Sequence, residues 1–251
     1  MIGPLCYVGG KNRLAKHIVS LLPPHHTYVE PFAGGAQVLF HKEPSAVEVL
    51  NDLNDEIPNL FRVIQSHEQE FVRYTHFLLA SRKWFELLEK TPPETLTDIQ
   101  RAARFYFLQK NAFGGLVVKR NYKAHIVSNP NFNPLRVPEI IEQAHQRLAR
   151  VQIECLPYQE ILRKFDSSNS LFYLDPPYYS RYLYRFNFEH RDFEELAACL
   201  SNLKGKFLLS LNDVPEVRKI FSGFRIEGVQ LAYSAQKKAG NRYKELLIRN
   251  F

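Results

Sequence analysis

One stretch limits the possible folds of this chain most: Leu171-Phe172-Tyr173-Leu174-Asp175-Pro176-Pro177-Tyr178. The four apolar residues show no helical periodicity, so they predict a short strand that is buried on both faces. Two prolines then exclude both a helix and a paired strand, so the chain must leave the sheet at Asp175. Open α/β sheets bind ligands at such strand ends. A rigid hydrogen-bond acceptor beside the Tyr178 ring is suited to bind a planar ring that carries an amino group and has been moved out of a stack of such rings. An ordinary Asp-Pro turn is the alternative.

Length and composition predict a soluble globular protein. The 251 residues suffice for one large domain or for a domain with an insert. There is no run of 18 apolar residues, and the N-terminus lacks the basic and apolar regions of a secretory signal. The three cysteines are too widely spaced to predict a disulfide framework or a zinc site. We therefore expect a cytoplasmic protein with reduced thiols, no bound metal and no membrane contact.

Positive charge is concentrated in residues 101–150. This segment holds nine of the 33 Lys and Arg residues and only two of the 26 acidic residues. In the rest of the chain the numbers of basic and acidic residues are therefore equal. A basic block in an otherwise neutral chain is typical of a surface that binds a polyanion. A solvated basic surface without a partner is the alternative.

The N-terminal part carries a glycine motif, Tyr7-Val8-Gly9-Gly10-Lys11, followed by a predicted helix from residue 12 to 19. Two glycines allow the backbone to approach a ligand, and Lys11 offers a positive charge to an anion. The motif is not a phosphate-binding P-loop, because that spacing requires Gly where Leu5 stands and Ser or Thr where Asn12 stands. A turn that enters a helix explains the motif nearly as well.

Two strands with polar ends follow. A strand over residues 28–32, a glycine turn over 33–36 and a helix from Gln37 have the plan of a nucleotide-type cofactor site. A second strand, residues 46–50, runs into Asn51-Asp52. An acid at the end of the second strand is placed to accept hydrogen bonds from ribose hydroxyls. The two features together favour a cofactor that contains a ribose.

The alternation of strands and helices disappears between residues 60 and 150. Thr97 and Gln100 predict a capping box at the start of a helix that ends near Lys110. Behind this helix lies a basic, polar run, of which we single out Lys119, Arg120, Asn121 and Lys123. Such side chains read base edges, and aromatic residues among them can wedge or stack. We interpret this segment as an inserted, mainly helical recognition region that contacts the polyanion.

The wound pattern resumes with strands over residues 151–156, 171–174 and 207–211, and a helix over 191–203. A segment rich in Tyr and Phe after Tyr178 predicts a closing lid, and residues 225–231 and 243–251 predict a terminal hairpin. The fold class is therefore α/β, with a doubly wound, mostly parallel, Rossmann-like sheet. We assign residues 1–59 plus 151–251 to this domain and residues 60–150 to the insert.

Taken in order, the motifs resemble one family. The set is Tyr7-x-Gly-Gly-Lys11, Glu30-Pro-Phe-Ala-Gly-Gly35, Asp52-x-Asn54, an insert, Asp175-Pro-Pro-Tyr178 and Ser210-x-Asn212-Asp213. It is similar to the Dam-type adenine-N6 DNA methyltransferases (D12 class, α arrangement), and the likeness covers essentially the whole chain. The resemblance implies an S-adenosylmethionine-dependent methyltransferase fold, double-stranded DNA as substrate, and a prokaryotic or phage enzyme. We expect a monomer, with a transient dimer as the alternative.

The resemblance also implies residue roles. Tyr7, Lys11, Phe32, Asp52 and Asp175 correspond to cofactor contacts. Our own hypothesis is that Lys11 meets the cofactor's carboxylate and Asp52 its ribose hydroxyls. Asp175, Pro176 and Tyr178 correspond to the group that holds the flipped adenine. One departure concerns Pro157-Tyr158, where many relatives carry Asp-Phe, so the acid that meets the cofactor's adenine is missing here.

The chemistry is consistent with this reading. Acceptors on Asp175 and Pro176 can localise the lone pair of an exocyclic amine, after which positioning contributes most to methyl transfer. Cytosine N4 or RNA adenine is an alternative target, because each presents the same kind of amine. A non-catalytic DNA-binding module of this fold and a nucleotide hydrolase are two further alternatives. Methylation at cytosine C5 requires a nucleophilic thiol, and no cysteine lies beside a motif.

Overall fold

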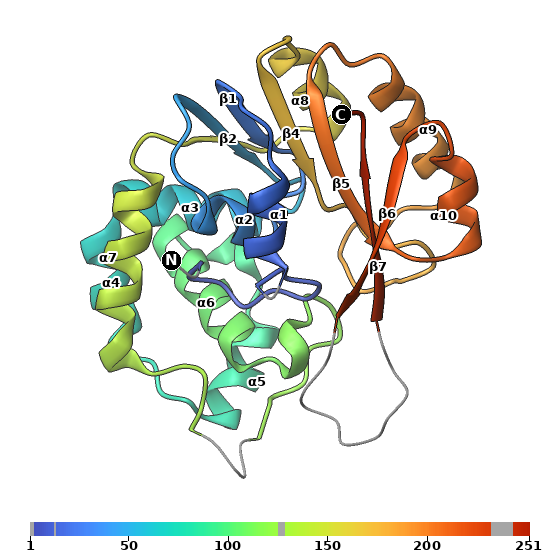
Figure 1. Cartoon of the computed structure of the whole chain (residues 1–251). Coiled ribbons are helices and arrows are strands. Elements are labelled where there is room, and N and C mark those ends of the chain that lie inside the picture. The colour runs from blue at the N-terminus through green and yellow to red at the C-terminus, as the bar shows by residue number, and fades with distance from the viewer. Residues whose placement is uncertain (1–2, 13, 125–128, 232–242) are drawn as a thin grey trace.

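One seven-stranded sheet organises the chain (Figure 1). The computed structural model describes residues 3–12, 14–124, 129–231 and 243–251. The strands are β1 Thr27–Glu30, β2 Val47–Asn51, β3 Gln152–Glu154, β4 Ser170–Leu174, β5 Lys206–Asn212, β6 Arg225–Leu231 and β7 Tyr243–Arg249. Their spatial order is β3-β2-β1-β4-β5-β7-β6. Only β7 runs antiparallel to its neighbours β5 and β6, whereas the other neighbouring pairs are parallel. The predicted doubly wound, mostly parallel sheet and the terminal hairpin are therefore confirmed.

The central strand β4 is buried on both faces, as predicted. Successive side chains of a strand point to opposite faces, so Leu171 and Tyr173 join one buried cluster and Phe172 and Leu174 the other. Helices α8 (Tyr158–Phe165), α9 (His190–Ser201) and α10 (Pro215–Ile220) cover the second face. Helices α1 (Ala15–Leu21) and α2 (Gln37–His41) and the insert cover the first (Figure 1).

The insert is mainly helical, as predicted. Its helices are α3 Glu56–Ser66, α4 Glu68–Thr75, α5 Arg82–Lys90, α6 Asp98–Asn111 and α7 Val137–Leu148, with short 3-10 turns at Pro93–Thr95, Phe113–Gly115 and Pro134–Arg136. The predicted boundary after residue 59 falls within α3, and apolar side chains of α6 share a cluster with Leu171 and Tyr173 of the sheet. The division into two domains stays a prediction.

The capping box at the start of α6 is confirmed. The Thr97 hydroxyl accepts a hydrogen bond from the Gln100 backbone N–H at 3.4 Å, and the Gln100 side chain accepts one from the Thr97 N–H at 3.1 Å. Two of the first free N–H groups of the helix are thereby satisfied. A 14-residue helix begins there and ends at Asn111.

Some element boundaries differ from those predicted. β1 ends at Glu30 instead of residue 32, because Pro31 has no N–H to donate to a neighbouring strand. The first helix begins at Ala15 instead of residue 12, and residue 13 is outside the described residues. β3 spans only Gln152–Glu154, at one edge of the sheet, where a single neighbour supports it. In the described ranges, no helix has the length and apolar character needed to cross a membrane.

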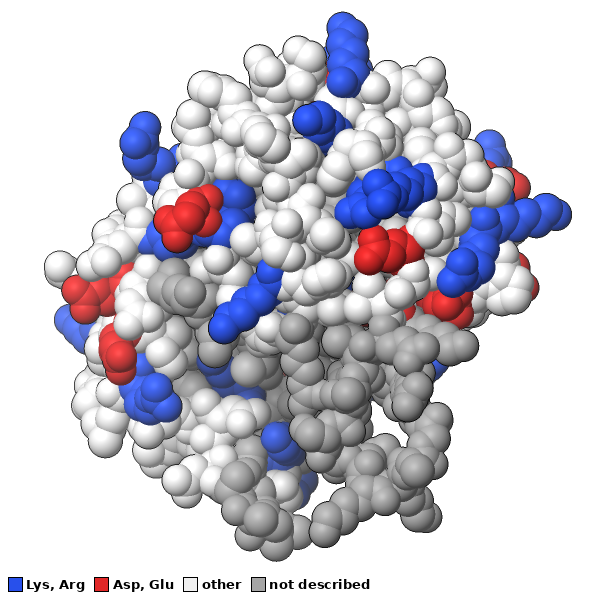
Figure 2. Space-filling model, in the orientation of Figure 1, with Lys and Arg blue, Asp and Glu red and all other residues white. Residues whose placement is uncertain are grey.

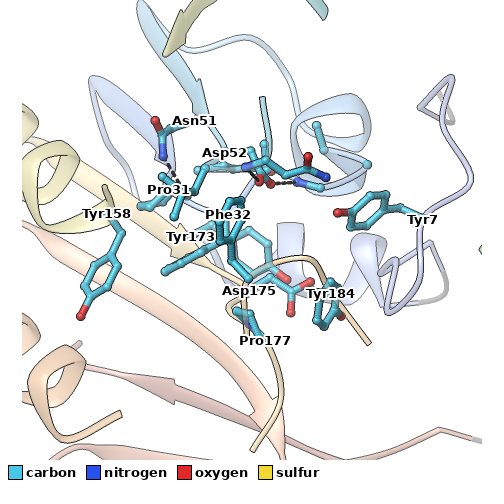
Figure 3. Close-up of a pocket in the computed structure, with 18 of the residues that line it drawn as sticks. Tyr7, Pro31, Phe32, Asn51, Asp52, Tyr158, Tyr173, Asp175, Pro177 and Tyr184 are labelled. Carbon is cyan, nitrogen blue, oxygen red and sulfur yellow. Dashed lines mark hydrogen bonds between the residues drawn. The ribbon is translucent and has the colours of Figure 1, made fainter. Parts of the chain in front are cut away.

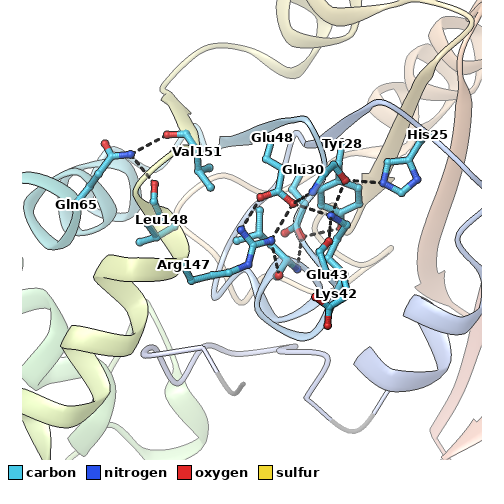
Figure 4. Close-up of polar contacts among 12 residues, drawn as sticks. His25, Tyr28, Glu30, Lys42, Glu43, Glu48, Gln65, Arg147, Leu148 and Val151 are labelled. Carbon is cyan, nitrogen blue, oxygen red and sulfur yellow. Dashed lines mark hydrogen bonds and ion pairs between the residues drawn. The ribbon is translucent and has the colours of Figure 1, made fainter.

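A buried polar cluster attaches the insert to the sheet (Figure 4). Arg147 of α7 donates two hydrogen bonds to the Glu48 carboxylate of β2, at 2.5 and 2.8 Å, and Lys42 donates a third at 2.6 Å. Gln65 of α3 donates to the carbonyls of Leu148 and Val151, at 2.7 and 2.8 Å. A buried charge without its partner would lower the stability of the fold. These contacts therefore hold the segment in which the chain returns from the insert to β3.

Candidate active site

The order of the strands determines where a ligand can bind. From β1 the chain continues to β2 and β3 on one side, whereas β4 leads to β5 on the other side, so the order reverses between β1 and β4. Open α/β sheets bind ligands at the carboxyl ends of the strands at such a point. The pocket drawn in Figure 3 lies there. Its lining includes the predicted residues Tyr7, Lys11, Phe32, Asp52 and Asp175.

The carboxylate of Asp52 is part of the glycine turn after β1. One oxygen accepts a hydrogen bond from the Gly34 N–H and the other from the Asn54 N–H, each at 2.9 Å (Figure 3). Gly34 has φ +49°, and a Cβ there would lie 3.1 Å from the Tyr7 ring, so glycine is required. Burial raises the pKa of Asp52 from 3.8 to about 6, although the two N–H groups act against this. The acid is thus fixed in place at the pocket wall.

Aromatic side chains form the other walls. The rings of Tyr7 and Tyr184 stack at a centroid distance of 6.2 Å, and Phe32 packs against Tyr158 at 5.4 Å and Phe188 at 5.7 Å. Tyr184 and Phe188 belong to the aromatic segment that the sequence predicts as a lid, and both line the pocket. Burial, followed by the charge of Asp52, raises the pKa of the Tyr7 hydroxyl well above its ordinary value. Tyr7 is therefore a neutral ring at physiological pH.

Asp175 lies at the centre of a hydrogen-bonded group. Its Oδ1 atom accepts from the Lys11 ammonium at 2.7 Å and from the Ser210 hydroxyl at 3.0 Å. Its Oδ2 atom receives no hydrogen bond from any described residue, and the side chain is 21% exposed. Burial raises the pKa of Asp175, and the positive charge of Lys11 acts in the opposite direction. Oδ1 is thus held by protein groups, and Oδ2 is free to accept a hydrogen bond from a ligand.

Lys11 is buried, with only 5% of its side chain exposed. Besides Asp175, its ammonium donates to the hydroxyl of Tyr178 at 2.7 Å and to the Gly9 carbonyl at 3.1 Å. Burial alone would lower the pKa of Lys11, but the negative charge of Asp175 and the neighbouring groups raise it well above its ordinary value. The ammonium is therefore charged, and its three N–H donors point at protein groups.

The segment after Asp175 is also held by β5. The backbone N–H of Tyr179 donates to the Asn212 side chain at 2.9 Å, and the Asn212 amide donates back to the Tyr179 carbonyl at 3.2 Å. Ser210 and Asn212, from the motif Ser210-x-Asn212, therefore fix the two ends of the segment from Asp175 to Tyr179, with Pro176 and Pro177 between them. The sequence singles out this motif but does not show what it contacts.

Glu245 of β7 was not predicted as a site residue. Its carboxylate accepts a hydrogen bond from the Tyr178 hydroxyl at 2.5 Å and lies 3.1 Å from the Lys11 ammonium. In the sheet Glu245 pairs with Asn212 of β5, at the edge where the pocket lies. An acid in the last predicted strand is the only signal in the sequence, and it is too common to point to a site.

The predicted polyanion-binding residues lie around a loop of the insert. Lys119 and Asn121 are exposed and Lys123 is half-buried. The Arg120 side chain is only 9% exposed, because it pairs with Glu89 of α5 at 3.1 Å. Figure 2 shows Lys and Arg side chains scattered singly or in small groups over the face seen in Figure 1, with Asp and Glu beside several of them.

The same loop reaches the N-terminal motif. The Val8 N–H donates to the Gly115 carbonyl at 3.0 Å, and a Cβ on Gly115 would lie 3.2 Å from the backbone of Tyr7. The neighbouring Phe113 is 65% exposed. An exposed aromatic ring thus lies next to the segment that lines the pocket, a feature that sequence analysis did not single out.

Comparison with known proteins bears on the identity of the chain. The family model described as D12 class N6 adenine-specific DNA methyltransferase matches residues 7–235. The chain is 24% identical to a type II methyltransferase of Lactococcus lactis subsp. cremoris, over 98% of this chain and 94% of that protein. It is 25% identical to a DNA adenine methylase of Serratia marcescens, over 69% of this chain and 66% of that protein. Because the matched residues include both the glycine turn and Asp175, the chain belongs to the D12 class of N6 adenine-specific DNA methyltransferases.

Proposed function

We propose that this chain uses S-adenosylmethionine to methylate adenine N6 within a specific sequence of double-stranded DNA, on a base turned out of the helix. The observation that carries the proposal is the Asp175 carboxylate, which has one oxygen fixed by Lys11 and Ser210 and the other free. An exocyclic amine needs two acceptors to localise its lone pair, and Asp175 Oδ2 and the Pro176 carbonyl supply them. The Tyr178 ring stacks on the extruded base, worth about 1–3 kcal/mol by analogy with single-strand binding.

The pocket beside Asp175 fits the cofactor. Asn54 Oδ1, a buried atom on the pocket wall, has no hydrogen-bond partner among the described residues, so a ligand donor would satisfy it. Asp52 accepts hydrogen bonds from the ribose hydroxyls, and Tyr7 and Phe32 pack against the cofactor. When bound, S-adenosylmethionine supplies a positively charged methyl donor, which an aromatic ring such as Tyr7 attracts.

Lys11 has a different role in this proposal from the one that the resemblance implies. Its donors already meet Gly9, Asp175 and Tyr178, so we assign it to holding Asp175 and not to the cofactor's carboxylate. Lys119, Asn121 and Lys123 contact the DNA, and the exposed Phe113 ring stacks against or between bases. We further propose that the protein acts as a monomer in the cytoplasm, where its DNA substrate is found.

Incubation with double-stranded DNA and isotopically labelled S-adenosylmethionine, followed by single-molecule mapping of modified bases, tests the proposal. We expect N6-methyladenine in one short sequence context. Label on cytosine N4, or label on RNA and not on duplex DNA, would replace the proposed substrate with one of the two alternatives. Absence of label from every nucleic acid would contradict the proposed activity and leave a non-catalytic DNA-binding module as the remaining alternative.

A further inference from the structure

Glu245 lies outside the part of the chain that the family model matches, which ends at residue 235. It is nevertheless buried, with 7% of its side chain exposed, and it contacts two residues of the site. Its Oε1 atom accepts the hydrogen bond from Tyr178 at 2.5 Å and lies 3.1 Å from the Lys11 ammonium. Lys11 in turn holds Asp175 at 2.7 Å. We call Lys11, Asp175, Tyr178 and Glu245 the sheet-edge cluster.

The direction of β7 explains how a residue near the end of the chain reaches this cluster. The parallel strands β1, β2 and β4 bring their carboxyl ends to the pocket edge. β7 is antiparallel to β5, so the beginning of β7 lies at that edge, with Glu245 opposite Asn212 and Leu246 opposite Leu211. Side chains alternate along a strand, so Leu246 packs into the apolar cluster on the second face and Glu245 points to the opposite face, toward Lys11.

We propose that Glu245 is a positioning residue of the active site, which orients the Tyr178 ring and shares the Lys11 ammonium with Asp175. The inference rests on the proposed function. Tyr178 donates its one hydroxyl proton in a hydrogen bond to Glu245, which leaves the hydroxyl oxygen to accept a hydrogen bond from Lys11. The two contacts fix the hydroxyl of the ring against which the target base stacks.

Glu245 also sets the charge that faces the target base. The sheet-edge cluster holds one ammonium and two carboxyl groups, so its formal charges sum to one surplus negative charge. Without Glu245, the ammonium would neutralise Asp175 alone. The amine nitrogen gains positive charge during methyl transfer, so a fixed negative charge beside it favours the transition state over the ground state. Glu245 therefore acts on kcat more than on the binding of DNA or cofactor.

The test compares Glu245→Gln, Tyr178→Phe and the double variant with the wild-type enzyme, on DNA that contains the mapped target sequence. Glu227→Gln is the matched control, because Glu227 lies on the adjacent strand β6 and pairs with Arg249, away from the pocket. We expect Glu245→Gln to lower kcat about 10–100-fold, less than the roughly 10²–10³-fold that follows loss of a group in direct contact with developing charge, because Glu245 acts through Lys11 and Tyr178. KM for DNA and cofactor should change less than about threefold, and Glu227→Gln should match wild type.

The double variant tests the contact itself. If Glu245 acts partly through the Tyr178 hydroxyl, Glu245→Gln should lower kcat less in the Tyr178→Phe background than in the wild type. Fluorescence of 2-aminopurine at the target position reports base placement without chemistry, and Glu245→Gln should change its intensity. A wild-type kcat for Glu245→Gln, or strictly multiplicative losses with unchanged fluorescence, would overturn the inference.

A folding defect is separated from this role by a second substitution. Glu245→Asp keeps the charge but withdraws the carboxylate from Tyr178 by one methylene group. If Glu245→Gln does not fold, a folded Glu245→Asp with lowered kcat supports the inference, and one with wild-type kcat overturns the proposed positioning of Tyr178 by Glu245. The proposed function fails separately, because it would be contradicted by a wild-type enzyme that places no methyl group on DNA adenine.

Discussion

The sheet-edge cluster and the basic loop of the insert differ in how firmly their side chains are held. Lys11, Asp175 and Glu245 are between 5% and 21% exposed. Together with Tyr178 they are joined by hydrogen bonds and ion pairs at 2.5 to 3.1 Å. In the loop, Lys119 and Asn121 are exposed. Each side chain in the cluster is therefore held in one conformation, whereas the exposed side chains of the loop can change conformation.

This difference matches two separate tasks. Stabilising a charge that develops on one atom requires groups that do not reorganise during the reaction, which burial and shared hydrogen bonds provide. Binding a polyanion requires positive charges near phosphates, and long exposed side chains suffice for this. Substitutions in the cluster should therefore change kcat or stability, and substitutions in the loop should change DNA affinity and its salt dependence.

The largest expected effect is that of Asp175→Ala on methyl transfer. Loss of the free acceptor should lower kcat about 10³-fold, in the range seen when a fixed group at a reacting centre is removed. The fold should persist, because Lys11 keeps its contacts with Glu245, Tyr178 and Gly9. Methyl incorporation and thermal melting measure the two effects. Asp98→Ala, which removes an exposed acid on α6, serves as control.

Lys11→Ala should produce the largest loss of stability. It leaves the buried Glu245 and the partly buried Asp175 without their shared cation, which costs about 3 kcal/mol. Urea unfolding at pH 7 gives the free energy of unfolding. Lys119→Ala removes the same side chain from an exposed position and should stay within about 0.5 kcal/mol of wild type. Equal losses in the two variants would contradict the contrast between the regions.

Cofactor binding should depend on pH through Asp52. Its pKa is raised to about 6, and the ionised form is the one that accepts hydrogen bonds from hydroxyls on both oxygens. As pH falls through 6 the carboxyl takes up a proton, so cofactor affinity should fall about tenfold between pH 7 and pH 5. Calorimetric titration without DNA measures this. Asp52→Asn should bind more weakly, by about 1–3 kcal/mol at pH 7, and lose the Asp52 contribution to the pH dependence.

The smallest effects are expected in the loop. Lys119→Ala and Lys123→Ala should each flatten the dependence of DNA affinity on salt by about one unit if they remove a phosphate contact. Cofactor affinity should not change. Arg120→Ala should instead lower stability, because Arg120 pairs with Glu89 inside the insert. A salt titration in which Lys119→Ala and Lys123→Ala both behave like wild type would show that this loop does not bind DNA.

The sequence predicted much of the sheet for local physical reasons. β4 and its end at Asp175 follow from an apolar run and two prolines, and the α6 capping box follows from Thr97 and Gln100, three residues apart. The environments of Glu245 and Arg120 were not predictable in this way. Glu245 reaches the cluster through the register of an antiparallel strand, and Arg120 meets Glu89 across two elements of the insert.

The most direct test of the central claim is a count of modified nucleosides. DNA is treated with S-adenosylmethionine and either wild-type protein or Asp175→Asn, digested to nucleosides and analysed by mass spectrometry. The amide keeps the shape of the side chain but offers one acceptor oxygen and no charge to the amine. We predict N6-methyladenine with the wild type and little or none with the variant. Equal amounts of N6-methyladenine with both proteins, or N4-methylcytosine in its place, would contradict the account.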